Sequence, residues 1–294
     1  MLVAFLGLGL IGGSIARAMR ASDDLATARL VAWTPSRAGP RQALADGVVD
    51  AVAATPADAV VGADLVILAA SPQACLSLLD ELAGPARRAL AATVVITDVA
   101  STKSAICARA QELGLPFIGG HPMAGRETSG FAAATADLFV RRPWVVVPGT
   151  EVASRAVDTV ERLARACGAR PMRMEAAAHD AAVAGTSHLP LILSAALVEA
   201  VAGESGGDAR PDRPFVPDLT AGGWRDMTRL ARGDVAMGSG IVATNAGPLA
   251  DRIRDLRAVL DGWLDELERP GGPNEDEVAA RLERARSRLE DLDR

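Results

Sequence analysis

Short apolar runs alternate with amphipathic, helix-like stretches through the first half of the chain. Each run has the length of a buried strand and is followed by polar and glycine-rich positions, where the chain is expected to turn. Alternation of buried strands with helical stretches is typical of a parallel sheet covered by helices on both faces. The predicted strands are residues 2–6, 30–33, 65–70, 94–97, 117–119 and 144–147, followed by a covering helix at 152–167 and a last strand at 171–174.

After residue 174 the pattern changes to long stretches rich in alanine and leucine, which predict helices. The longest is 176–201, and Pro190 inside it should kink the helix or unwind it locally. Apolar residues recur at helical spacing between Pro248 and Leu267, and again in 275–292. The turn-rich segment 203–217 is expected to be a mobile loop. We therefore predict an α/β fold: an N-terminal Rossmann-type doubly wound sheet (residues 1–174) followed by an all-α dimerisation domain (175–294).

Composition and charge narrow the classes of function. Hydrophobic residues make up 49% of the 294 positions, which leaves ample apolar surface for two cores. The net charge of −6 and a pI near 5.2 argue against general binding to nucleic acid or to an anionic membrane. We expect no membrane segment, no metal site and a cytoplasmic location, because the apolar runs are short and the three cysteines are far apart.

A glycine-rich turn directly follows the first predicted strand. Gly7, Gly9 and Gly12 have the G-x-G-x-x-G spacing that allows a tight turn, close approach of a pyrophosphate, and packing of a helix on the sheet. The helix, predicted to begin near Ser14, would offer free N–H groups and a favourable dipole to that pyrophosphate. The candidate dinucleotide-binding residues are Gly7, Gly9, Leu10, Ile11, Gly12 and Ser71, the last of which follows the strand at 65–70.

The end of the second predicted strand bears on the choice of cofactor. An acidic residue at this point usually binds the ribose hydroxyls of NAD, but the chain continues into Thr34, Ser36 and Arg37. Hydroxyl and guanidinium groups suit a 2′-phosphate, so this pattern favours NADP over NAD. The alternative is that Arg37 is a solvated loop residue and that NAD binds without the acidic residue.

A lone histidine stands in a second glycine-rich stretch. His121 follows Gly119 and Gly120 and precedes Pro122, so it cannot lie inside a regular helix. We interpret it as a loop side chain held near a ligand, with a satisfied structural histidine as the alternative. Together with the dinucleotide pattern upstream, this points to hydride chemistry.

Three more segments accompany these two: Asp98 to Lys103, Ser187 to Pro190, and Gly222 to Ala231. In this order and spacing, the set resembles the prephenate/arogenate dehydrogenase family of tyrosine biosynthesis, over most of the chain. The resemblance implies oxidative decarboxylation of a cyclohexadienol, with hydride passing to NAD(P), an anionic small-molecule substrate and a homodimer formed through the helical domain.

The resemblance also implies roles for individual residues. His121 would take the proton of the ring hydroxyl, and Ser101 would share that hydroxyl or cap the helix that follows it. Arg229 would bind a substrate carboxylate, and Arg225 would add positive potential or pair with Asp226. Three further roles are implied for other residues: Glu127 in gating the pocket, His188 in either substrate binding or structure, and His179 with Asp180 in structure or capping.

Two departures from the family pattern concern the substrate side chain. Leu191 stands where the family often has a second histidine, and residues 237–240 replace a segment that often holds tryptophan. They leave open whether the substrate is prephenate, arogenate or an amino-substituted analogue.

Two alternative functions are an imine or β-hydroxyacid dehydrogenase and a dinucleotide sensor without catalysis. The first usually needs a lysine in the helical domain, yet no lysine follows Lys103. The second would not need His121, Ser101 and Arg229 together.

Overall fold

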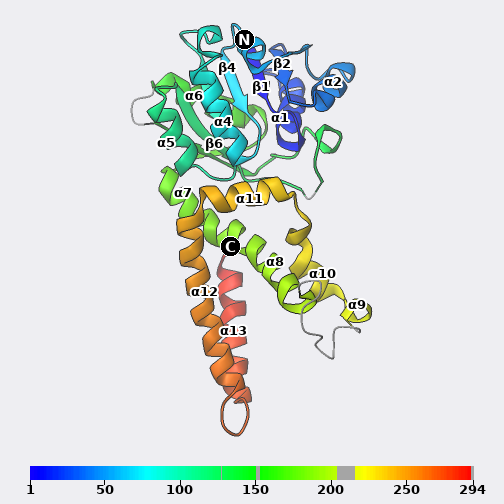
Figure 1. Ribbon diagram of the computed structural model, residues 1–294, viewed down its shortest axis with the longest axis vertical. Coiled ribbons are helices and arrows are strands. Elements are labelled where there is room, and N and C mark those ends of the chain that lie inside the picture. Colours follow the sequence, from blue (N-terminus) through cyan, green and yellow to red (C-terminus); the bar gives the residue numbers. More distant parts are fainter. Residues whose placement is uncertain (127, 150–152, 204–215, 293–294) are drawn as a thin grey trace. The chain divides into compact units, whose positions relative to one another are not determined.

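The computed structural model describes the chain except residues 127, 150–152, 204–215 and 293–294. The described residues form two compact units, Met1–Leu249 and Ala250–Arg294. The first unit holds the sheet and the helices that pack on it (Figure 1). The second unit is made of the end of one long helix and the helix that follows.

The described strands form one eight-stranded sheet in the order β3-β2-β1-β4-β5-β6-β7-β8. All neighbouring pairs are parallel except β6 and β7, which are antiparallel. The direction of chain progression reverses between β1 and β4, and this switch point is where open α/β sheets bind ligands. The strands are β1 (Leu2–Leu6), β2 (Arg29–Trp33), β3 (Ala51–Val52), β4 (Leu65–Leu68), β5 (Val95–Asp98), β6 (Phe117–Pro122), β7 (Pro143–Val147) and β8 (Arg170–Arg173).

Helices cover both faces of the sheet and bury two apolar cores. Alternate residues of β1 point into different cores: Val3 and Phe5 into one, Ala4 and Leu6 into the other, all fully buried. Helices α1, α2 and α6 contribute to the first core, and α3, α4 and α5 to the second. Their bounds are α1 (Leu10–Ala21), α2 (Ala38–Ala45), α3 (Pro56–Val60), α4 (Pro72–Ala83), α5 (Ser104–Glu112) and α6 (Ser154–Ala166), with short 3₁₀ turns at η1 (Arg87–Ala89) and η2 (Phe131–Ala133).

The part after β8 is helical in all its described elements. The expected disturbance at Pro190 is confirmed as a π-helical turn directly before it, since proline cannot donate the hydrogen bond that a regular helix needs there. The elements are α7 (Ala176–Val183), η3 (Ala184–His188), α8 (Leu189–Ala202), α9 (Val216–Leu219), α10 (Gly222–Thr228), η5 (Arg229–Arg232), α11 (Val235–Thr244), α12 (Ala246–Leu267) and α13 (Glu275–Leu292).

One helical run, Ala176–Ala202, is long and apolar enough to cross a membrane by length and composition, although only 22% of its most apolar window is buried. A core helix of a soluble protein passes the same test. The run combines α7, the π-helical turn and α8.

Several details differ from the sequence predictions. The short strand β3 was not predicted, and β7 runs antiparallel where a parallel strand was expected. Helix α1 begins at Leu10 rather than near Ser14, because glycine at positions 12 and 13 is compatible with a helix that packs closely on the sheet. The predicted loop at 203–217 lies mostly outside the described residues.

Candidate functional site

The glycine-rich turn between β1 and α1 lies at the switch point of the sheet. Gly7 has φ +106°, and a Cβ added to it would stand 2.1 Å from the carbonyl oxygen of Ala69. A Cβ on Gly12 would lie 2.7 Å from the carbonyl oxygen of Gly7, so this residue lets α1 approach the strand end closely. Nothing lies within 4 Å of a Cβ on Gly9, which leaves the space that a pyrophosphate needs. No side chain caps the N-terminus of α1, so its first N–H groups, at Leu10 and Ile11, can bind an anion.

The loop after β2 contains the three residues predicted to select NADP. Arg37 has a left-handed backbone, with φ 55°, and directly precedes α2 at its N-cap position. Its N–H donates to Oγ1 of Thr34 at 3.0 Å, and its guanidinium donates to the carbonyl of Ala54 at 3.0 Å. Ser36 is exposed. The guanidinium is therefore held at the end of β2 and has donors left for another group.

His121 lies in strand β6 and not in a loop, so the loop prediction was wrong. Its strand pairs with β7, where His121 stands opposite Val145. Glycine explains this: a Cβ on Gly120 would lie 2.5 Å from the carbonyl oxygen of Asp98, so only glycine lets β6 lie this close to β5. The imidazole is 9% exposed and is held on a rigid element near the carboxyl end of the strand.

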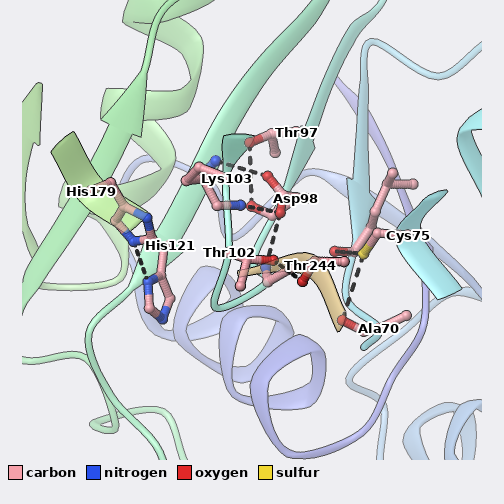
Figure 2. Close-up of polar contacts among 12 residues, drawn as sticks. Ala70, Cys75, Thr97, Asp98, Thr102, Lys103, His121, His179 and Thr244 are labelled. Carbon is pink, nitrogen blue, oxygen red and sulfur yellow. Dashed lines mark hydrogen bonds and ion pairs between the residues drawn. The ribbon is translucent and has the colours of Figure 1, made fainter. Parts of the chain in front are cut away.

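Two further side chains extend the contacts of His121 into the helical part of the chain, and Figure 2 shows the first of them, His179, against His121. Its Nδ1 lies 2.8 Å from Nε2 of His179, and Nδ1 of His179 lies 2.8 Å from Oδ1 of Asp180. The two rings meet edge to face, with centroids 5.1 Å apart. Burial, followed by the positive charge of Lys103, holds the pKa of His121 well below its usual value. His121 is therefore neutral at pH 7.

A buried ion pair stands beside this histidine. Lys103 is the only lysine in the sequence, and its Nζ pairs with Oδ2 of Asp98 where both side chains are fully buried (Figure 2). The carboxylate of Asp98 also accepts from the backbone N–H groups of Gly120 and Ala100, each at 3.0 Å. This pair thus fixes the end of β5 against the residue that precedes His121.

Ser101 lies in the loop between β5 and α5, and it is half-buried. It does not cap a helix, because α5 begins at Ser104. The capping oxygens come instead from Asp180 on α7, which accepts from the N–H groups of Lys103 and Ser104 at 2.8 Å each. The capping expected of Asp180 is therefore found, but it acts on α5 rather than on its own helix. Asp180, although distant in sequence, thus caps the N-terminus of α5, a role that the local sequence suggested for Ser101.

The remaining histidine, His188, is 1% exposed and lies at the end of the π-helical turn. Its Nδ1 is 3.0 Å from Nδ2 of Asn245, which also donates to the carbonyl of Asp180 at 2.9 Å. Burial lowers the pKa of His188 to about 4, so its ring is neutral at pH 7. A contact of 2.8 Å between the hydroxyls of Thr102 and Thr244 similarly joins the loop after β5 to α11.

The predicted carboxylate-binding residues lie in the helical part. Arg229 and Arg225 are both exposed, and Arg229 begins the 3₁₀ turn η5. That turn is fixed to α8, since Ala231 N–H donates to the buried hydroxyl of Ser194 at 2.8 Å. Ser71 ends the connection from β4 to α4 and precedes Pro72. Glu127 lies outside the described residues.

Sequence reasoning did not single out Asp98, Lys103 or Asn245 as parts of the site. The sequence did contain a signal for Asp98 and Lys103, because a carboxylate and the only lysine flank a short loop directly after an apolar strand.

The three cysteines are free, and burial raises the pKa of each thiol to about 12. Among the described residues no group of three or more histidine, cysteine or acidic side chains could hold a metal ion.

A dinucleotide-type glycine turn and a neutral histidine at one edge of a doubly wound sheet define a Rossmann-type oxidoreductase. Sequence similarity identifies the family. Residues 15–173 match the family described as "Prephenate dehydrogenase, nucleotide-binding domain", and residues 175–278 match "Prephenate dehydrogenase, dimerization domain". The chain belongs to the prephenate dehydrogenase family.

Individual relatives agree with this assignment. A prephenate dehydrogenase of Bacillus subtilis is 33% identical over 91% of this chain and 68% of its own length. The structure of Synechocystis arogenate dehydrogenase is 29% identical, with a TM-score of 0.79, and covers 99% of this chain and 100% of its own. Prephenate dehydrogenase from A. aeolicus, whose structure was solved with hydroxyphenyl propionate and NAD⁺, is 22% identical and has a TM-score of 0.88. The match covers 99% of this chain and 98% of the A. aeolicus chain, and it supports the fold.

Proposed function

We propose that this chain catalyses the NADP-dependent oxidative decarboxylation of a cyclohexadienol in tyrosine biosynthesis, converting prephenate to 4-hydroxyphenylpyruvate or arogenate to tyrosine. The observation that carries the proposal is the neutral, buried His121 at the carboxyl edge of a sheet whose switch point holds the glycine turn. We further propose that residues 1–174 form the nucleotide-binding domain, that residues 175–294 form the substrate-binding and dimerisation domain, and that the protein acts in the cytoplasm.

The residues at the switch point fit a nicotinamide dinucleotide. Gly7, Gly9 and Gly12 leave room for a pyrophosphate, and the N–H groups of Leu10 and Ile11 would bind it. When bound, the nicotinamide would accept the hydride. Ser71 would contact the cofactor from the end of β4. Arg37, with Thr34 and Ser36, would bind the 2′-phosphate, and this is the reason for preferring NADP over NAD.

His121 suits the removal of a proton from the ring hydroxyl. A neutral imidazole offers a lone pair to that proton as the hydride departs, whereas an imidazolium has none. The low pKa of His121 keeps this lone pair available at neutral and mildly acidic pH. Ser101, in the loop after the neighbouring strand β5, would hydrogen-bond the same hydroxyl. Loss of carbon dioxide then leaves an aromatic ring, which makes the step effectively irreversible.

The helical part would hold the substrate. Arg229 would bind a substrate carboxylate with its two-pronged guanidinium, and Arg225 would add positive potential. His188, neutral and buried, would form part of the substrate pocket, and Glu127 would gate it. Leu191 approaches Gly238: a Cβ on this glycine would lie 3.6 Å from the leucine Cδ2. The two departures from the family pattern thus adjoin each other, and we propose that together they select the substrate side chain.

We also propose a homodimer formed through the helical domain. Several apolar side chains of α12 are 40% to 62% exposed in the single chain, among them Ile253, Leu260, Leu264 and Leu267. Only 22% of the most apolar window of the run from α7 to α8 is buried. Exposed apolar surface of this kind is typical of a subunit interface. A second copy, rather than lipid, would cover it.

The test is the variant His121→Asn. It should lower kcat by at least two orders of magnitude while the dissociation constant for NADP stays within about twofold, because the histidine acts on the reacting hydroxyl and not on the cofactor. If wild-type protein bound NADP and turned over neither prephenate nor arogenate, a dinucleotide sensor or an enzyme for an amino-substituted analogue would replace this proposal.

A further inference from the structure

We infer that His179 and Asp180 are positioning residues that fix the proton of His121 on Nδ1 and so present its Nε2 lone pair to the substrate. The inference rests on the proposed function of His121. It concerns two residues for which sequence suggested structure or helix capping. Four directed contacts carry it.

The tautomer of each ring follows from the acceptor at the end of the chain of contacts. The Asp180 carboxylate can only accept, so Nδ1 of His179, at 2.8 Å, must carry a proton. A neutral His179 then has its lone pair on Nε2. This atom lies 2.8 Å from Nδ1 of His121, which must therefore donate. The remaining nitrogen of His121, Nε2, is left with a lone pair.

Asp180 is itself held in a fixed orientation. Its Oδ1 accepts from Lys103 N–H and its Oδ2 from Ser104 N–H, both at 2.8 Å, at the positive end of α5. Burial alone would raise the pKa of Asp180, but the hydrogen bonds from His179 and from these two backbone groups lower it below its usual value. The carboxylate is thus ionised at pH 7 and cannot donate to His179.

The same contacts would stabilise His121 after it takes the proton. As the O–H bond of the substrate breaks, its proton forms a bond to Nε2, and the Nδ1–H of His121 keeps donating to His179. Asp180 provides the negative charge that faces the new imidazolium through His179, whereas Lys103 and a protonated His188 would oppose it. Asp98 neutralises Lys103 at close range. The arrangement corresponds to a base oriented by a second group that is itself oriented by a carboxylate.

The tautomers can be measured directly because the sequence contains only three histidines, 121, 179 and 188. Protein labelled with ¹⁵N-histidine would give three imidazole spin systems, assigned with the single variants His179→Gln and His188→Gln. We expect the proton on Nδ1 in both His121 and His179. His188 serves as an internal control: Nδ1 accepts from Asn245, so its proton should be on Nε2. A wild-type spectrum in which fewer than two of the three rings carry their proton on Nδ1 would overturn the inference, even if every variant failed to fold.

Asp180→Leu tests the cause. The variant removes the only group that obliges Nδ1 of His179 to donate, so the protons of His179 and His121 are no longer fixed on Nδ1. We expect the Nε2-protonated tautomer to become populated in both rings, His188 to stay unchanged, and kcat to fall on the order of 10³-fold or more, with KM and NADP affinity within about threefold. Tautomers that stay wholly on Nδ1 in both rings would refute the inference. Because the spectra need no substrate, they remain informative if the proposed reaction proves wrong.

Discussion

Removal of the buried Lys103 ammonium should strongly destabilise the fold. In Lys103→Met the Asp98 carboxylate keeps its two backbone donors, Gly120 and Ala100, but loses its counter-ion where neither side chain reaches solvent. Removal of one partner from a buried pair costs about 3–5 kcal/mol, because the other charge is left uncompensated. For a domain of this size each kcal/mol corresponds to about 2–4 °C, so the melting temperature should fall by roughly 6–20 °C.

The assay is chemical and thermal unfolding of wild-type and Lys103→Met protein, with Arg109→Met as the matched control. Arg109 forms an ion pair with Asp80 at 2.7 Å, but the two side chains are 40% and 53% exposed. Loss of such an exposed pair should cost less than about 1 kcal/mol. A Lys103→Met variant within 1 kcal/mol of wild type would refute the reasoning.

The Lys103→Met variant should also change the pH dependence of kcat/KM. The charge of Lys103 opposes protonation of His121, so its removal raises the pKa of His121 toward the usual value. The acid limb of kcat/KM should then move to higher pH in Lys103→Met and remain in place in Arg109→Met. An acid limb at the same pH in wild type and Lys103→Met would contradict the electrostatic role.

Three other predictions concern separate parts of the chain. Arg37→Ala should lower the ratio of kcat/KM for NADP over NAD by roughly 10- to 100-fold, the equivalent of a charged hydrogen bond, and an unchanged ratio would exclude 2′-phosphate binding by Arg37. His188 has a folded pKa of about 4 against an unfolded value near 6.5, so its contribution to stability is present above pH 6.5 and is lost as pH falls toward 4. This loss is about 3 kcal/mol in urea unfolding, and it should be absent in His188→Gln. Leu264→Arg, on the exposed apolar side of α12, should shift the protein from dimer to monomer in analytical ultracentrifugation, whereas Asp265→Ala, at an exposed position on another side of that helix, should leave the dimer intact.

The hydrophobic pattern was sufficient to predict most of the sheet. Runs such as Val3 to Leu6 of β1 and Leu65 to Leu68 of β4 are fully buried and apolar, so their strand character is visible in the sequence. Strand β3 has two half-buried residues, too few to produce a pattern. The reversed direction of β7 depends on the connection from β6 and leaves no trace in the residues of the strand itself.

The site was predictable only where its chemistry is local. The glycine turn carries its own signal, because Gly7 and Gly12 are required by contacts within the turn and with the next strand. The partners of His121 could not be found in this way. His179 is 58 residues distant, and Asp180 caps a helix 76 residues earlier, so these contacts exist only once β6, α5 and α7 are packed together.

The most direct test of the central claim is steady-state turnover by the purified protein with prephenate and with arogenate, each with NADP and with NAD. Nicotinamide reduction would be followed by absorbance, together with release of carbon dioxide and of the aromatic product. We expect one carbon dioxide and one aromatic product per NADPH formed, and faster turnover with NADP than with NAD. Protein that binds NADP but yields no carbon dioxide from either substrate would contradict it.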